Sequence, residues 1–399
     1  MIGEDLRLGV VVPERNVVSE SFIQAQIEGL SEDTIEVWGS PRPLFHGQGG
    51  TILSGTSSLL ARALGLVTGK GSAWAAAAAG NRLPTSRYEK QLAAFLRRSR
   101  VNVVLAEYGP TGVAVMNACA RSATPLVVHF HGYDAYQRET LNQMQESYAR
   151  LFDAAGRIVA VSKHMVGQLS DLGAPLDRTV YNPYGVDVDV FRGGQPGSAA
   201  PTLLALGRFV DKKAPTLTLR AFAKVHQEEP QSQLVMLGDG PLREACIELA
   251  RDLEIATSVS FPGSIGHDGV VEWMRRMRCF VQHSRRAADG DSEGTPLAVL
   301  EASSCGLPVV STRHAGIVEA VRDGVSGFLV EEGDVDGMAD HMLRLVREPE
   351  LAERMGAAGR RHVEANYSSQ KSLGRLRSIL VEVARSGGRV RPRAGIRAR

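Results

Sequence analysis

With 399 residues, the chain is long enough for two or three domains that each bury an ordinary hydrophobic core. Apolar residues make up 43% of it and charged residues 23%, a balance that excludes the disordered, collagen-like and fibrous classes. The formal net charge of +2 gives no bulk basicity, so we expect no nucleic acid partner.

In chain order, short apolar runs alternate with longer helical patterns. The predicted strands are Leu8–Val12, Val101–Ala106, Leu126–His129, Ile158–Val161, Leu203–Ala205, Gln233–Leu237, Val259–Phe261, Cys279–Gln282, Pro308–Ser311 and Gly327–Val330. The predicted helices are Ser21–Leu30, Arg87–Arg98, Gly112–Arg121, Lys163–Leu172, Pro215–Glu228, Pro241–Leu253, Val270–Met277, Pro296–Ser304 and Val335–Arg347. Many of the strands lack period-two alternation, as expected when both faces are covered. The alternation of strands and helices favours βαβ units and parallel sheets.

The segment Asn182–Pro201 is rich in glycine and proline, and a new strand–helix series begins just after it, so we expect a linker there. We therefore predict an α/β fold of two Rossmann-like domains, residues 1–190 and 200–365, whose parallel sheets face each other across a cleft. A C-terminal helix at about 368–385 is expected to pack back on the first domain. Ligands of such sheets bind beyond the carboxyl ends of the strands, so the cleft is the expected site.

Two segments and the chain's location allow less specific predictions. Residues 47–80, rich in glycine and alanine, fit small-residue helices packed in the first domain, a mobile acceptor flap or a membrane-touching patch. The basic tail, 386–399, is expected to be disordered, with a weak contact to an anionic membrane as the alternative. The four cysteines form no C-x-x-C pair, and we find neither a signal peptide nor an apolar span, so we expect a cytoplasmic protein.

Two short polar motifs follow predicted strands of the second domain. In GRFVDKK, Arg208 offers a planar fork of donors and Lys213 a compact charge, which together suit a diphosphate whose negative charge grows as it leaves. A solvated basic loop is the alternative. In Gly238-Asp239-Gly240, the glycines would let the backbone approach a ligand closely, although a plain tight turn explains them equally well.

A helix start is predicted within the run DGDSEGTPLAVLE. Thr295 is expected to cap a helix that begins at Pro296, and Gly306 is expected to end it. Because proline has no amide hydrogen, the free donors are the amides of Leu297 and Ala298. Aided by the helix dipole, these amides would face an anion.

Carboxylates flank this helix start. Glu293 precedes the helix and Glu301 lies within it, and a carboxylate is a common partner for vicinal ribose hydroxyls. Asp289 and Asp291 spell D-x-D, which could hold a divalent metal through its oxygens. We expect no metal there, because the loop lies beside a helix whose N-terminus already supplies positive potential.

The first domain contributes the run VVHFHGYD. His129 ends a predicted strand, where a histidine is more often structural. His131 comes two residues later, before a glycine that permits close approach of a ligand, and is the better candidate for the cleft.

Taken together, these motifs resemble the family 4 retaining glycosyltransferases of the GT-B fold, in particular members that act in polysaccharide and small-glycoside biosynthesis. The resemblance runs over roughly residues 180–345, through GRFVDKKAP, LVMLGDGPLR, VSFPGSI, QHSRRAADGDSEGTPLAVLEASSCGLPVVSTRHAGIVEAV and DGVSGFLVEEGD. The first half is similar more loosely, through SESFIQAQIEGL and HFHGYD. The stretch Pro13–Ser21 lacks the glycine-rich loop of many relatives, so acceptor contacts from that loop are not transferred, and Val318 stands where the usual motif has proline.

The resemblance implies a role for each candidate. Arg208 and Lys213 would bind the donor diphosphate, Glu301 the ribose hydroxyls and Glu293 the donor sugar, with His131 near the C6 side of that sugar. The remaining donor-binding residues implied are Gly238, Asp239, Gly240, Ser284, Gly294, Thr295, Pro296 and Leu297.

The implied activity is transfer of a hexose-type sugar from a nucleoside-diphosphate donor, with UDP preferred, to an acceptor hydroxyl. Retention of configuration is implied, with the leaving diphosphate as the base, and no metal or other cofactor is expected. The domains are expected to close on the donor. The acceptor (saccharide, small glycoside or lipid-linked sugar) and the oligomeric state stay open. The alternatives are a nucleotide-sugar epimerase or phosphorylase of the same fold, or a non-catalytic nucleotide-sugar-binding subunit.

Overall fold

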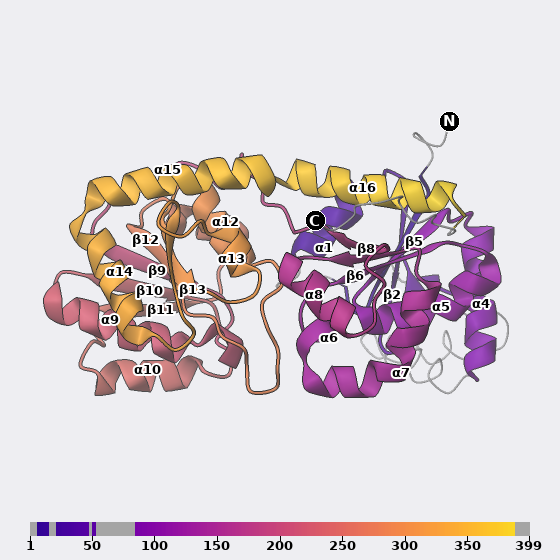
Figure 1. Ribbon diagram of the computed structural model, residues 1–399, viewed down its shortest axis with the longest axis horizontal. Helices are drawn as coiled ribbons and strands as arrows, with labels where there is room; N and C mark the ends of the chain where they lie inside the picture. Colours follow the sequence, from indigo (N-terminus) through magenta and orange to yellow (C-terminus); the bar gives the residue numbers. More distant parts are fainter. Residues whose placement is uncertain (1–5, 16–20, 48–49, 53–83, 388–399) are drawn as a thin grey trace, which may run out of the picture.

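The computed structural model describes residues 6–15, 21–47, 50–52 and 84–387, which form two α/β units side by side (Figure 1). The prediction for residues 47–80 and that for the tail fall mostly outside the described residues. Of the first segment, Gly50–Thr51 is described, and it pairs antiparallel with Phe45–His46. No helix in the described part of the chain is long and apolar enough to cross a membrane.

The first unit contains an eight-stranded sheet in the order β4-β3-β2-β1-β5-β6-β7-β8. Its strands are β1 (Leu8–Val12), β2 (Thr34–Trp38), β3 (Phe45–His46), β4 (Gly50–Thr51), β5 (Val103–Glu107), β6 (Leu126–Phe130), β7 (Arg157–Ala160) and β8 (Thr179–Tyr181). Its helices are α1 (Ser21–Gly29), α4 (Thr85–Arg98), α5 (Gly109–Ser122), α6 (Tyr133–Tyr136), α7 (Arg138–Ala154) and α8 (Lys163–Asp171). The strands from β2 to β8 by way of β1 are parallel, whereas β3 and β4 extend one edge as an antiparallel hairpin.

The second unit contains a six-stranded, all-parallel sheet in the order β11-β10-β9-β12-β13-β14. Its strands are β9 (Thr202–Leu206), β10 (Gln233–Leu237), β11 (Val259–Gly263), β12 (Cys279–Gln282), β13 (Val309–Thr312) and β14 (Gly327–Val330). Its helices are α9 (Pro215–Glu228), α10 (Arg243–Asp252), α11 (His267–Met274), α12 (Leu297–Ser304), α13 (Ile317–Ala320), α14 (Val335–Arg347) and α15 (Pro349–Asn366). The predicted α/β class with two parallel sheets is confirmed.

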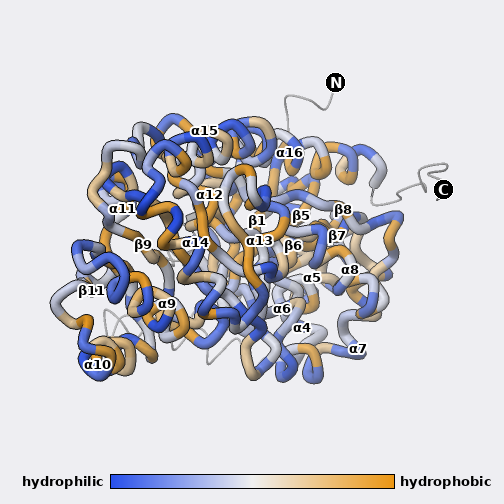
Figure 2. The backbone as a smooth tube through the Cα atoms, turned by 60° about the vertical axis from the view of Figure 1, so that its left-hand side comes forward, coloured by the Kyte–Doolittle hydropathy of each residue, from blue (hydrophilic) through white to orange (hydrophobic). Residues whose placement is uncertain are grey.

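The last helix, α16 (Ser369–Arg385), leaves the second unit and packs on the first (Figure 1). Leu376, Leu380 and Val383 belong to the same buried cluster as Leu105 of β5 and Val127 of β6. Arg157 of β7 forms an ion pair with Glu382, with 2.7 Å between Nη2 and Oε1. The neighbouring helix α15 alternates between hydrophilic and hydrophobic segments, as expected of a helix with one buried face (Figure 2).

The two units contact each other directly. The chain crosses between them twice, and the crossings pair where the Val186 amide donates to the Tyr367 carbonyl at 2.8 Å. The Glu319 carboxylate of the second unit accepts from the Lys163 amide at the N-terminus of α8, at 2.7 Å. A carboxylate at that helix end also meets a favourable dipole. The two domains therefore contact each other at these points.

Several helix boundaries differ from the predictions. The helix predicted at Val270–Met277 spans His267–Met274. Helix α7 was not predicted, although its apolar positions Leu141, Met144, Tyr148 and Leu151 repeat at helical spacing.

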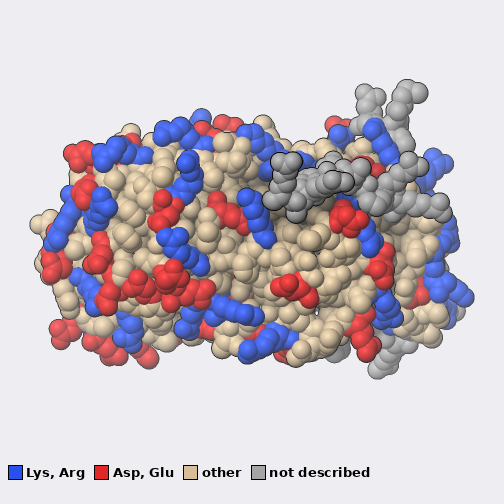
Figure 3. Space-filling view, in the orientation of Figure 1, with Lys and Arg blue, Asp and Glu red and all other residues tan. Residues whose placement is uncertain are grey.

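Lys and Arg are interspersed with Asp and Glu over the face shown in Figure 3, in keeping with the nearly neutral net charge.

Candidate functional site at the carboxyl ends of the two sheets

The loop after β9 brings Arg208 and Lys213 to one edge of the second sheet. They line a small cavity with Gly207, Thr218 and Gln282. Arg208 is exposed, and no ion pair holds it among the described residues. Its guanidinium is therefore available to an anion at the mouth of the cavity.

Lys213 pairs with the predicted sugar-binding carboxylate. Its Nζ lies 2.9 Å from Oε1 of Glu293, whose side chain is buried. Burial opposes ionisation of Glu293, but the charges of Lys213 and Lys212 outweigh it and lower its pKa to about 2. Ser284 supports the same carboxylate, because its hydroxyl donates to Oε1 at 3.3 Å. The structure thus brings Lys213 and Glu293 together as an ion pair, and the Ser284 hydroxyl donates to the same carboxylate.

The loop containing Gly238, Asp239 and Gly240 packs backbone to backbone against the loop of Arg208. A Cβ on Gly238 would lie 2.1 Å from the Gly207 carbonyl oxygen, and both Gly238 and Gly240 have positive φ. The Asp239 carbonyl accepts from the Phe209 amide at 2.9 Å. Glycine is needed at both positions because the Arg208 loop packs directly against their backbone, and this packing supports the Arg208 loop.

Helix α12 begins one residue later than predicted, at Leu297, and Pro296 occupies the N-cap position without a side-chain cap. The prediction that Thr295 caps this helix is wrong. Its hydroxyl instead donates to the Val161 carbonyl at 2.6 Å and accepts from the Tyr184 amide at 3.2 Å, so Thr295 joins the two domains. The helix ends at Ser304, with Cys305 as its C-cap and Gly306 at φ +89° directly after it, as expected.

Glu301 lies on α12, and burial raises its pKa to about 7, with Lys213 lowering it in part. In its ionised form this carboxyl group can accept hydrogen bonds from ribose hydroxyls. Its position beside the Lys213 charge places it at the edge of the same site.

The D-x-D oxygens already have protein partners. Asp291 pairs with Lys212 at 2.9 Å, and its other oxygen accepts from the Ser292 amide at 2.8 Å. Asp289 accepts from the Gln137 side chain of the other domain at 2.9 Å and from the Asp291 amide at 3.0 Å. The pair therefore serves as contacts within the loop and to the first domain.

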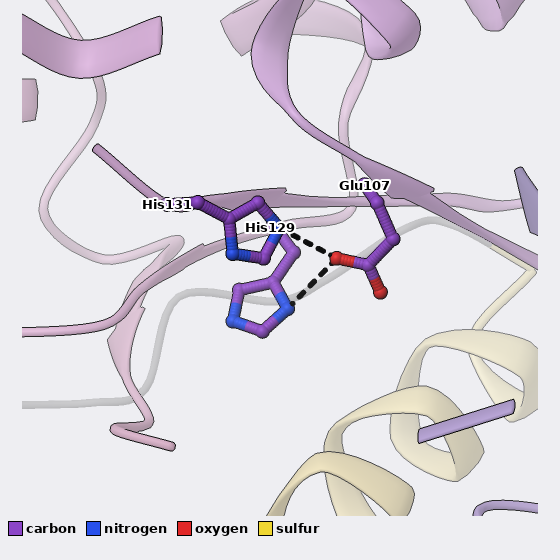
Figure 4. A group of neighbouring side chains, drawn as sticks. All are labelled: Glu107, His129 and His131. Carbon is purple, nitrogen blue, oxygen red and sulfur yellow. Dashed lines mark hydrogen bonds and ion pairs between the residues drawn. The ribbon is translucent and has the colours of Figure 1, made fainter. Parts of the chain in front are cut away.

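His131 lies beyond the end of β6, within a buried cluster of the first domain (Figure 4). Glu107 and His129 are register partners on adjacent parallel strands, and His131 follows two residues on, so all three side chains point to one face. His131 Nε2 lies 2.7 Å from Glu107 Oε2, and its Nδ1 lies 2.5 Å from the Tyr184 hydroxyl. Burial opposes ionisation of Glu107, but His129 and His131 outweigh it, and its pKa falls to about 2.

Glu107, His129 and His131 are also residues of types that ligate metals, and their ligand atoms lie within 4.8 Å of one another. Two atoms bound to one zinc ion in a tetrahedral site are roughly 3 Å or more apart. The 2.7 Å between His131 Nε2 and Glu107 Oε2 is instead the distance of a hydrogen bond. The cluster fits a hydrogen-bonded network better than a metal centre.

The two halves of the site meet at the Glu293 loop. A Cβ on Gly294 would lie 2.2 Å from the His131 carbonyl oxygen, so this position admits glycine alone without a shift of the backbone. His314 supports the loop, because its Nε2 accepts a hydrogen bond from the Glu293 amide at 3.1 Å.

The sequence analysis did not identify four residues of this site: Glu107, Tyr184, Lys212 and His314. Lys212 lies within a recognised motif, and the register of β5 with β6 would have indicated Glu107.

Comparison with known proteins agrees with this architecture. The family model described as "Glycosyl transferases group 1" matches residues 192–362, and that described as "Glycosyl transferase 4-like domain" matches residues 46–185. The chain belongs to the family 4 glycosyltransferases of the GT-B fold.

Two relatives and one solved structure illustrate the similarity. WcaL of Escherichia coli K12, named for colanic acid biosynthesis, is 30% identical over 70% of each chain. A GDP-mannose-dependent phosphatidylinositol monomannoside mannosyltransferase of Mycolicibacterium smegmatis is 28% identical, over 67% of this chain and 73% of its own. The crystal structure of Anabaena HepE with UDP and glucose shares the fold at a TM-score of 0.71 and 14% identity, covering 95% of this chain and all of that one.

Proposed function

We propose that this glycosyltransferase moves a hexose from a nucleoside-diphosphate sugar to an acceptor hydroxyl with retention of configuration. The observation that carries the proposal is the Lys213–Glu293 pair, which lies beside an exposed Arg208 that forms no ion pair with any residue the structure describes. Two cations meet the diphosphate, and the amides at the start of α12 add further positive potential. Glu293 accepts from hydroxyls of the sugar, and Glu301 accepts from the ribose.

A same-face mechanism follows from these assignments. Glu301 and Glu293 are committed to binding, so neither is poised as the general base that inversion requires. The acceptor hydroxyl attacks the anomeric carbon as the bond to the diphosphate breaks, and its proton passes to the leaving phosphate oxygen. Arg208 and Lys213 stabilise the charge of that phosphate, and no metal or other cofactor takes part.

We infer a UDP sugar as donor and a saccharide or lipid-linked sugar as acceptor. The similar proteins differ in their nucleotide. HepE was crystallised with UDP, whereas the mycobacterial relative is named as GDP-mannose-dependent. That relative is named as a phosphatidylinositol monomannoside mannosyltransferase, which supports a lipid-linked sugar as acceptor, and WcaL is named for colanic acid biosynthesis.

The test is a donor-hydrolysis screen with UDP-glucose, UDP-N-acetylglucosamine, GDP-mannose and ADP-glucose. We expect slow release of nucleoside diphosphate from one of them, abolished in Lys213→Ala. Conversion of the intact donor to an epimer would identify an epimerase instead. Binding without any turnover would identify a non-catalytic subunit.

A further inference from the structure

His314 is a buried histidine whose two ring nitrogens both contact the protein. Its Nε2 lies 3.1 Å from the backbone nitrogen of Glu293, and its Nδ1 lies 2.5 Å from Oε1 of Glu332. The His314 side chain is 4% exposed, whereas that of Glu332 is 38% exposed. The imidazole therefore connects a carboxylate near the surface to the residue that carries the proposed sugar-binding carboxylate.

The two partners of His314 fix its tautomer. A backbone amide only donates, so Nε2 has to accept and carries no proton. Nδ1 then carries the proton and donates to Glu332. Burial opposes ionisation of Glu332, but hydrogen bonds from the Arg286 amide and from His314 outweigh it and lower its pKa. Glu332 thus selects the neutral form of His314 that can accept from the Glu293 amide.

The residues of this network follow three neighbouring strands. Arg286 comes after β12, His314 after β13 and Glu332 after β14, and these strands are adjacent in the second sheet. All three residues line a cavity of about 460 Å³, which His164 of the first domain also lines. The ends of three parallel strands therefore set the position of the His314 ring, which makes it a rigid support for the Glu293 loop.

The backbone around His314 is also packed on the Glu293 loop. Ala315 has φ +41°, in the left-handed region that a residue with a Cβ rarely adopts. A Cβ on Gly316 would lie 1.9 Å from the Gly294 carbonyl oxygen, so the two turns are in direct backbone contact. Backbone strain of this kind persists only where the surrounding structure enforces it. Side chain and backbone together therefore fix the turn of His314 against the residue pair Glu293 and Gly294.

We propose that His314 and Glu332 are positioning residues that hold the Glu293 carboxylate where it meets the hydroxyls of the donor sugar. The carboxylate itself contacts Lys213 at 2.9 Å and the Ser284 hydroxyl at 3.3 Å, but a bound diphosphate competes for Lys213. With the donor in place, the hydrogen bond to His314 still restrains the backbone of Glu293. Both residues act through Glu293 and not on the reacting atoms. The inference rests on the proposed function and deepens it.

The test compares a reaction that involves the sugar with a binding step that does not. The readouts are kcat/KM for hydrolysis of UDP-glucose and the Kd of UDP by calorimetry, or GDP-mannose and GDP if the donor screen selects GDP. His314→Ala removes the acceptor of the Glu293 amide, so we expect kcat/KM to fall by about tenfold or more. The Kd of the nucleoside diphosphate should stay within about twofold. The reason is that Thr295 anchors the start of α12 separately, through the Val161 carbonyl.

Conservative variants separate the hydrogen bonds from the bulk of the ring. His314→Gln keeps an acceptor for the amide and a donor for Glu332, so its kcat/KM should stay within about threefold of wild type. Glu332→Gln still accepts from Nδ1 and should resemble wild type, whereas Glu332→Ala no longer selects the tautomer and should lower kcat/KM. The matched control is His226→Ala, which removes a ring that contacts Ser258 Oγ at 3.2 Å in the same domain and should change neither readout.

Three results would overturn the assignment. The first is an unchanged kcat/KM in His314→Ala. The second is a rise in the Kd of the nucleoside diphosphate that matches the fall in kcat/KM, which would show a structural role. The third is a His314→Gln variant as impaired as His314→Ala.

Glu293→Ala tests the proposed function separately. If kcat/KM falls in Glu293→Ala and in Lys213→Ala but not in His314→Ala, the proposed function stands and the inference fails. A normal kcat/KM in Glu293→Ala would instead refute the sugar-binding role of that carboxylate, and the role of His314 with it.

Discussion

Replacing Lys213 with methionine should destabilise the second domain in a pH-dependent way. Glu293 is buried and has a pKa of about 2 against an ordinary 4.5, a difference worth about 3 kcal/mol at about 1.4 kcal/mol per unit. Lys212 and the Ser284 hydroxyl remain in the variant, so we expect a loss of about 2–3 kcal/mol near pH 7.

The sign of the pH dependence follows from the lowered pKa. Stabilisation by ionised Glu293 is fully present above pH 4.5 and is lost as the pH falls towards about 2. The difference between wild type and Lys213→Met should therefore be largest at neutral pH and shrink below pH 4.5. Urea unfolding followed by circular dichroism at pH 7, 5 and 3.5 measures it.

The control is Lys224→Met, which removes an exposed partner of Asp336 and should leave the urea midpoint nearly unchanged. The double variant Lys213→Met/Glu293→Gln should be less destabilised than the two single variants added together, because the unpaired charge is gone. A loss that is independent of pH, or strict additivity, would refute the ion pair as the cause.

Four further outcomes are expected. Arg208→Ala should lower kcat by about 10²–10³ in a steady-state assay, since it removes one preorganised donor to the leaving group, and unchanged turnover would contradict its role. The KM for the donor should rise as the pH falls below about 7, where Glu301 takes up a proton, and Glu301→Gln should remove that dependence. Activity should survive treatment with EDTA. A loss of activity that Mn²⁺ restores would instead support metal binding by Asp289 and Asp291. Proton NMR of the first-formed product from an α-linked donor should show an α linkage, whereas a β linkage would refute retention.

Among the described strands, all six of the second sheet and four of the eight of the first could be predicted, because a strand covered on both faces is a largely apolar run. Val103–Glu107 and Cys279–Gln282 are buried throughout, and the sequence shows it. Strand Thr34–Trp38 was missed because Glu36 interrupts its apolar residues. Helix α7 was missed because polar residues dominate its sequence, although a single apolar stripe packs it on the domain.

The candidate site likewise contains residues that a local motif reveals and residues that no local motif reveals. Lys213 and Glu293 stand in motifs that identify themselves by local sequence, and the structure brings them together. Glu107 and Tyr184 stand in no motif. Glu107 reaches His131 through strand register, and Tyr184 reaches it from a segment interpreted as a linker. Such contacts join residues 24 and 53 positions apart, and no local pattern records them.

The return of α16 to the first domain bears on how the chain folds during synthesis. The second sheet is built from one contiguous stretch, residues 202–330, whereas the first domain takes Leu376, Leu380 and Val383 from near the end of the chain into its core. On the ribosome, the domain that is translated first therefore has to wait for α16 before the face of its sheet that packs on this helix is covered. The usual order, in which the N-terminal domain is completed before its successor emerges, does not apply to this topology.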